Sequence, residues 1–158
     1  MSDVLIRPYE AKDLERILEL TKEGFPGVSI DYHIEMKLGY AAPGWEERKC
    51  GDIRKLIQVE PQGVFVAEAA GRVVGYVIVA SAPDKSLGRI TDLVVDAQMR
   101  NQGLGRRLIA KALEYIKEQG LVFAKIETLD NNAVGQALYP QFGFKEMARQ
   151  IHYVMRVD

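Results

Sequence analysis

Cysteine and histidine are scarce in this sequence, with one cysteine and two histidines among 158 residues. The lone Cys50 excludes a disulfide within the chain. No second cysteine or histidine stands at zinc-site spacing from it, and His33 and His152 lie far apart. We therefore expect no bound metal. Cys50 lies in a charged stretch without a neighbouring histidine, so we expect a bystander thiol rather than a nucleophile.

An excess of charge of either sign is also missing, because 21 lysines and arginines oppose 22 aspartates and glutamates, giving a net charge of −1. Such a chain is not expected to bind nucleic acid or an anionic membrane surface. No apolar run approaches the length of a membrane-spanning helix, and the first residues lack the apolar core of a signal peptide. These absences predict a cytoplasmic protein.

The sequence does contain enough apolar residues for one folded core. Its hydrophobic fraction of 47% over 158 residues is ordinary for a soluble globular domain. No internal repeat, low-complexity tract or linker divides it. We therefore predict a single domain over residues 1–158.

Hydrophobic periodicity and turn residues predict an α/β (α+β) fold with a mixed, mostly antiparallel sheet and flanking helices. We expect strands at residues 4–7, 64–69, 73–80, 89–95, 122–129, 144–147 and 150–157, and helices at 11–22, 31–38, 45–59, 104–119 and 133–139. Gly71 and Arg72 are expected to close a hairpin. A helical crossover joins the strands at 89–95 and 122–129, so these two should be parallel.

The most informative segment is residues 100–105, Arg-Asn-Gln-Gly-Leu-Gly, between a strand and a helix. Backbone N–H groups of such a turn and the helix N-terminus favour a phosphate-bearing ligand. A P-loop requires lysine and serine or threonine after its second glycine, where Arg106 and Arg107 stand. A Rossmann fingerprint requires glycine or alanine at Leu108. Glu127 does stand where a ribose-binding acid would, so a nucleotide-binding protein remains an alternative.

The pattern Arg/Gln-x-x-Gly-x-Gly/Ala, filled by Arg100, Gly103 and Gly105, resembles the GNAT superfamily of CoA-dependent N-acyltransferases. Residues 132–144, Asn-Ala-Val-Gly-Gln-Ala-Leu-Tyr-Pro-Gln-Phe-Gly-Phe, resemble a second GNAT signature at the expected distance. The resemblance implies a sheet whose parallel pair splays apart. It implies an acetyl-CoA-binding core at about residues 90–145 and an acceptor-side segment at about 24–60.

The same resemblance implies acetyl transfer from acetyl-CoA to a primary amine by direct attack in a ternary complex. The acceptor is a protein N-terminus, a lysine or a small-molecule amine, and a homodimer is left open. A non-catalytic acyl-CoA-binding or sensor domain on the same fold is the alternative.

The resemblance also assigns roles to individual residues. The residues expected to bind acetyl-CoA are Leu93, Val94, Val95, Arg100, Asn101, Gln102, Gly103, Leu104, Gly105, Arg106, Asn132 and Tyr139. Tyr139 is the candidate acid for the departing thiolate. Glu127 and Asp92 are the candidate bases for the amine, with water as a further option. Asn132 would also cap the helix that it precedes.

Overall fold

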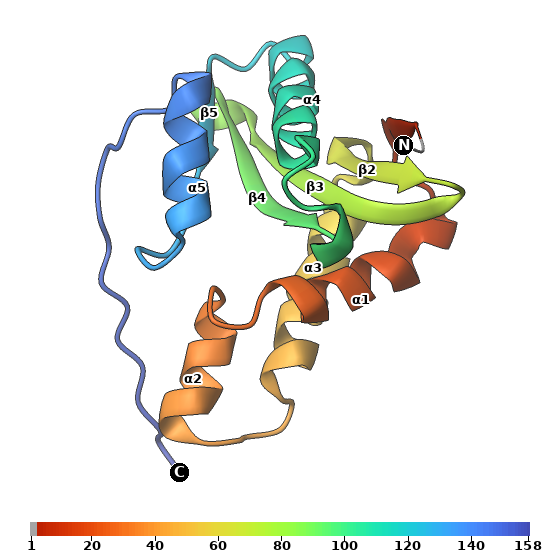
Figure 1. Cartoon of the computed structure of the whole chain (residues 1–158). Coiled ribbons are helices and arrows are strands. Elements are labelled where there is room, and N and C mark those ends of the chain that lie inside the picture. The colour runs from red at the N-terminus through yellow and green to blue at the C-terminus, as the bar shows by residue number, and fades with distance from the viewer. Residues whose placement is uncertain (1–2) are drawn as a thin grey trace.

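The computed structural model describes residues 3–158 as a five-stranded sheet with helices on both faces (Figure 1). The strands, in their order across the sheet, are β1 (Val4–Pro8), β2 (Val64–Ala69), β3 (Arg72–Ala82), β4 (Leu87–Val95) and β5 (Phe123–Ile126). The helices are α1 (Leu14–Gly24), α2 (Ile30–Leu38), α3 (Trp45–Val59), α4 (Leu104–Glu118) and α5 (Ala133–Leu138). Single 3₁₀ turns precede α1 and α4, and another, Tyr139–Phe142, follows α5.

The sheet is mixed, as the sequence predicted. β1 to β4 pair antiparallel, and β5 joins β4 in parallel after the crossover through α4. The hairpin between β2 and β3 turns at Ala70 and Gly71, one residue earlier than expected, and both have positive φ angles of 49° and 75°. This pair of angles matches the type I′ turn that suits the twist of a two-residue hairpin.

Each face of the sheet carries its own core. Helix α4 covers one face, and α1 and α3 cover the other (Figure 1). The apolar stripe of α4, which includes Leu108, Ile109 and Ala112, is fully buried against the first face. Ile17, Leu20 and Ile53 are fully buried against the second. Since burying one such Leu or Ile side chain contributes roughly 1.5–3 kcal/mol, these stripes hold both layers on the sheet.

A buried ion pair ties β1 to the start of α1. Asp13 is 4% exposed, and its carboxylate accepts hydrogen bonds from both terminal nitrogens of Arg7 at 2.8 and 2.9 Å. It also accepts the Glu10 N–H at 2.8 Å. The hydrogen bonds from Arg7 hold the pKa of Asp13 below its usual value. Arg7 in turn reaches Glu68 of β2, so the network spans three elements.

The two strands expected at 144–147 and 150–157 do not form. Residues 144–158 have no regular secondary structure, and residues 145–158 are exposed throughout. After Gly143, whose φ is 96°, the chain leaves the turn that follows α5, runs in extended form outside α5 and ends beside α2 (Figure 1). The pattern of these residues is strand-like, but a strand forms only where a neighbour accepts its backbone hydrogen bonds, and none of residues 3–158 does so.

Candidate active site

The glycine turn places free backbone N–H groups at the start of α4. Gly103 precedes the helix with a φ of 77°, a conformation that favours glycine. The first hydrogen bond into the helix runs from the Arg107 N–H to the Gly103 carbonyl at 3.2 Å. The N–H groups of Leu104, Gly105 and Arg106 precede it and find no acceptor within residues 3–158. A Cβ at Gly103 would meet no atom within 4 Å, so the turn is uncrowded at this residue.

The polar side chains of the turn mostly serve the turn itself. The Arg100 Nε donates to the Val95 carbonyl at 3.3 Å, and the Gln102 amide donates to the Gln98 carbonyl at 3.4 Å. Asn101 has a φ of 61°. The Arg100 guanidinium is therefore directed toward the end of β4.

The second motif lies directly beside the first. The Leu138 Cδ2 atom lies 3.8 Å from the position of a Cβ at Gly105, and the Arg106 guanidinium lies 6.0 Å from the centre of the Phe142 ring. These contacts join the start of α4 to the end of α5, although the motifs are separate in sequence. The structure thus brings together the two segments on which the sequence resemblance rests.

Strand β5 pairs with β4 over its whole length, but β4 is paired with it only over its first half. The parallel register runs from Leu87 with Phe123 to Ile90 with Ile126 and then stops. The register between β3 and β4 shifts where Asp92 faces Ile78 and Ile90 faces Val79, so the intervening Thr91 forms a β-bulge.

Past this bulge lie Leu93, Val94 and Val95, whose backbone groups have no strand partner on the β5 side within the described chain. The side chain of Val94 is buried on one face of the sheet, while Leu93 and Val95 pack toward the other. The opening between β4 and β5 is the predicted splay.

Asn132 caps α5 as expected. Its Oδ1 accepts the Gly135 N–H at 3.1 Å, and its Nδ2 donates to the Thr128 hydroxyl at 2.8 Å. Tyr139 follows α5 and lies edge-on to Phe144, with 6.3 Å between the ring centres. Burial raises the pKa of Tyr139, so its phenol stays protonated at neutral pH.

Gly135 is a site residue that the sequence reading missed. A Cβ there would lie 2.9 Å from the Tyr139 hydroxyl oxygen and 2.8 Å from the Asn132 amide nitrogen. Any larger residue must therefore displace the tyrosine or the capping asparagine. The available signal was a glycine inside a short helix, four residues before the candidate acid, because residues i and i+4 share one helix face.

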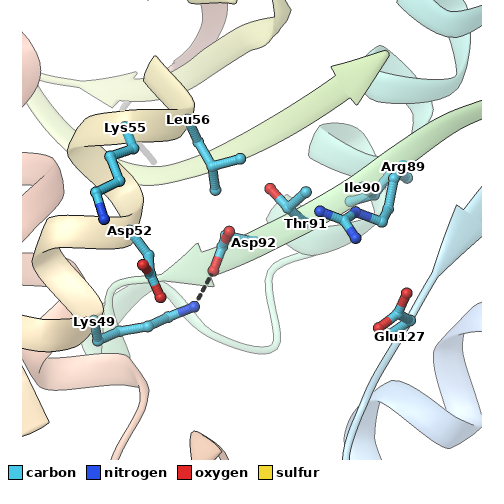
Figure 2. Close-up of a pocket in the computed structure, with 9 residues that line it drawn as sticks. All are labelled: Lys49, Asp52, Lys55, Leu56, Arg89, Ile90, Thr91, Asp92 and Glu127. Carbon is cyan, nitrogen blue, oxygen red and sulfur yellow. Dashed lines mark hydrogen bonds and ion pairs between the residues drawn. The ribbon is translucent and has the colours of Figure 1, made fainter. Parts of the chain in front are cut away.

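A cavity of about 400 Å³ opens between α3, β4 and the segment after β5 (Figure 2). Its lining residues are Lys49, Asp52, Lys55, Leu56, Arg89, Ile90, Thr91, Asp92 and Glu127. The two candidate bases therefore line one cavity, on opposite sides of its open space (Figure 2). Four lining residues belong to α3, within the segment expected on the acceptor side.

The two carboxylates differ in their surroundings. Asp92 is 4% exposed and pairs with the Lys49 ammonium at 2.5 Å, while that ammonium also lies 4.3 Å from the centre of the Phe25 ring. Glu127 is exposed and pairs with Lys125 at 2.7 Å, which lowers the pKa of Glu127. Lys49 was not anticipated, since its partner lies far away in sequence. Both carboxylates are therefore paired with a lysine, and they differ in exposure, since Asp92 is buried and Glu127 is exposed at the cavity.

Comparison with known proteins decides the family. The model of the Acetyltransferase (GNAT) family matches residues 14–144, which includes the glycine turn, the splayed strands and α5. This chain belongs to the GNAT family. Mycothiol acetyltransferase from Segniliparus rotundus is 29% identical over 157 residues, covering 96% of this chain and 55% of that protein. The chain therefore spans little more than half the length of this relative.

Other GNAT proteins match over comparable lengths. The ribosomal protein bS18 alanine N-acetyltransferase of Escherichia coli is 27% identical over 127 residues, covering 80% of each chain. Among solved structures, PaiA N-acetyltransferase from Thermoplasma acidophilum in complex with coenzyme A has a TM-score of 0.75 at 20% identity, covering 94% of this chain and 93% of that one. Aminoglycoside N-acetyltransferase AAC(6')-Iy in complex with CoA has a TM-score of 0.71 at 20% identity, covering 99% and 97%. These structures share the GNAT fold.

Two negative findings complete the description of this GNAT chain. Within residues 3–158, no three His, Cys, Asp or Glu side chains are grouped closely enough to hold a metal ion. Over the same residues, no helix combines the length and the apolar composition needed to cross a bilayer.

Proposed function

We propose that this protein transfers the acetyl group of acetyl-CoA to a primary amine by direct attack in a ternary complex. The observation that carries the proposal is the meeting of three features: free N–H groups at the start of α4, the opening between β4 and β5, and α5 beside both. GNAT membership supports the same reaction. The sheet would hold the two reactants together, and this proximity lowers the barrier to attack.

Each part of acetyl-CoA has a matching group in the site. The N–H groups of Leu104, Gly105 and Arg106 suit the pyrophosphate, because a helix N-terminus attracts anions. The unpaired backbone of β4, residues 93–95, suits the amides of the pantetheine arm, which would bind there as an added strand does. A backbone N–H of the same segment would polarise the thioester carbonyl.

Two residues on opposite sides of the site would carry the proton transfers, Tyr139 toward the thiolate and Glu127 toward the amine. The amine nitrogen attacks the carbonyl carbon, and the carbon–sulfur bond breaks. Tyr139, whose raised pKa keeps it protonated, would donate its proton to the departing thiolate and regain one from solvent. Glu127 would accept the amine proton directly or through water. We favour Glu127 over Asp92 because Asp92 is buried beneath Lys49, whereas Glu127 is exposed at the cavity, where an amine can reach it.

The acceptor is proposed at the level of chemical class. One relative is named as an acetyltransferase of mycothiol and another of ribosomal protein bS18, and a small-molecule or protein amine is accordingly proposed here. The ionised Glu127 at the cavity would attract such a cationic amine. We propose that residues 1–158 act as one domain, in a homodimer. The lone, buried Cys50 agrees with a cytoplasmic location, where disulfides are rare.

Ligand binding and turnover test the proposal separately. Acetyl-CoA and CoA at one hundred times their Kd should stabilise the fold by about 2.7 kcal/mol, which raises Tm by roughly 5–10 °C. NAD and ATP should have little effect. An amine panel with detection of the released thiol then identifies the acceptor. A larger stabilisation by NAD than by acetyl-CoA would contradict the proposal.

A further inference from the structure

The cavity of about 400 Å³ between α3 and β4 is lined by charges of both signs, and two of its three cations have no counter-ion. Lys49 is paired with Asp92. Lys55 of α3 and Arg89 of β4, in contrast, form no ion pair with any residue among 3–158, and neither does Asp52 of α3. The cavity therefore offers charged groups to a ligand that itself bears charges.

Arg89 stands where the sheet concentrates positive charge. In the parallel register of β4 and β5, Arg89 lies directly opposite Lys125, and the next pair along the strands is Ile90 with Ile126. These two isoleucines pack on the α4 side, so Arg89 and Lys125 share the face that α3 covers. Glu127 also lies on that face and pairs with Lys125 at 2.7 Å. Since two neighbouring cations repel, an anion bound beside Arg89 would supply the charge that is missing there.

The cation and the carboxylate nearest the splay face the same open space. Figure 2 shows the Arg89 guanidinium extending from β4 into the cavity above Glu127, while Lys55 runs along α3 on the other side. The hydrogen bond from Lys125 and, to a smaller extent, the charge of Arg89 lower the pKa of Glu127. Arg89 and Glu127 thus lie within electrostatic range of each other without forming an ion pair, which leaves each of them accessible to a ligand.

We propose that the acceptor is a small molecule with a carboxylate close to its amine, as in an amino acid, and that Arg89 binds this carboxylate. The inference rests on the proposed acetyl transfer and narrows its acceptor. A guanidinium presents a planar fork of donors that matches a carboxylate, and the neighbouring Glu127 suits the ammonium of the same molecule. The cavity volume lies in the range of about 300–1,000 Å³ that is typical of small-molecule sites.

The position of Glu127 connects this pose to the reaction. The last pair between β4 and β5 is Ile90 with Ile126, so Glu127 is the first residue beyond the pairing, at the entrance to the opening proposed for the pantetheine arm. An amine held there lies beside the thioester, and its carboxylate stays behind at Arg89. The carboxylate takes no part in the bonds that form and break. Arg89 should therefore affect KM of the acceptor and not kcat.

Matched acceptors test the requirement for a carboxylate. The standard amino acids, without cysteine because its thiol would itself be detected, are each compared with their own primary amide, which keeps the amine and the side chain. Thiol release from acetyl-CoA should show kcat/KM about tenfold higher, or more, for the acid of the preferred pair. Amidated dipeptides that begin with the same residues form a third set. Amides or dipeptides that are acetylated as well as the acids would overturn the proposal.

Substitution of Arg89 tests which residue binds the carboxylate. Arg89→Gln should raise KM of the preferred amino acid about 10- to 100-fold with little change in kcat, and Arg89→Lys, which keeps the charge, should restore part of this loss. Arg89 is exposed, so both variants should fold. Lys117→Gln is the matched control, because Lys117 is an exposed cation on α4, which covers the other face of the sheet. An unchanged KM in Arg89→Gln would exclude Arg89 as the carboxylate site.

Binding separates this inference from the proposed acetyl transfer. With CoA bound, the standard amino acids are screened by thermal shift, and at least one should raise Tm of the wild type further but not that of Arg89→Gln. If no amine releases thiol from acetyl-CoA, the acetyl transfer fails, and this difference in Tm still decides the role of Arg89. If acids and amides are acetylated equally, the acetyl transfer stands and the carboxylate site is wrong. The absence of any such rise in Tm also contradicts the site.

Discussion

At the residue scale, Tyr139 is the side chain on which turnover should depend most directly. Tyr139→Phe removes one hydroxyl and leaves the ring in contact with Phe144, so fold and acetyl-CoA affinity should stay near wild type. The loss of one acid should lower kcat by about 10²-fold, because the proton is needed only as the thiolate leaves. Steady-state kinetics with a good acceptor measure this. If Tyr139→Phe turned over at the wild-type rate, Tyr139 would serve packing and not proton donation.

Gly135 provides a second measurement on the same hydroxyl. Gly135→Ala must displace the Tyr139 ring or Asn132, since the new Cβ would approach both within 3.0 Å. Its effect on kcat should therefore overlap with that of Tyr139→Phe, and the double variant should be hardly worse than either single one. Gly51→Ala is the control, because a Cβ there meets nothing within 4 Å. If the double variant instead lost kcat by the product of the two single-variant factors, Gly135 would act independently of the Tyr139 hydroxyl.

Asp13 should determine part of the acid sensitivity of the fold. Its pKa is lower in the folded state than in the unfolded chain, so its contribution is complete above the unfolded value of about 4 and is lost as pH falls through the folded value. Asp13→Asn should lower the free energy of unfolding by roughly 1–3 kcal/mol at pH 7. Urea unfolding at pH 7 and pH 3 should show this difference shrinking in acid. A difference that grows in acid would contradict the assignment.

At the scale of elements, the start of α4 allows a matched test of anion binding. Gly105→Val places a branched side chain among the free N–H groups, and its Cβ meets only Leu138, at an ordinary 3.8 Å. Gly51→Val makes the same change inside α3. Both variants should fold, and thermal shift should show the response to CoA abolished only for Gly105→Val. Equal responses of the two variants would exclude the turn as the pyrophosphate site.

Most elements were predictable because their signals are local. The sequence prediction placed a helix at residues 45–59, which are the bounds of α3, and the glycine turn located the start of α4. The Lys49–Asp92 pair was beyond prediction, because it joins residues 43 positions apart that only the packing of α3 against β4 brings together. The orientation of Arg100 toward Val95 likewise depends on how the turn folds back on its strand.

At the scale of the whole molecule, the error in the sequence prediction has a definite cause. The alternation at 150–157 predicts a strand, but a strand forms only where a neighbouring strand accepts its backbone hydrogen bonds, and alternation does not identify that neighbour. In the structure, Arg156 directs this segment toward α2, and its apolar face stays in water. An alternating pattern thus reports that a face is suited to burial. It does not report whether the covering surface lies in the same chain.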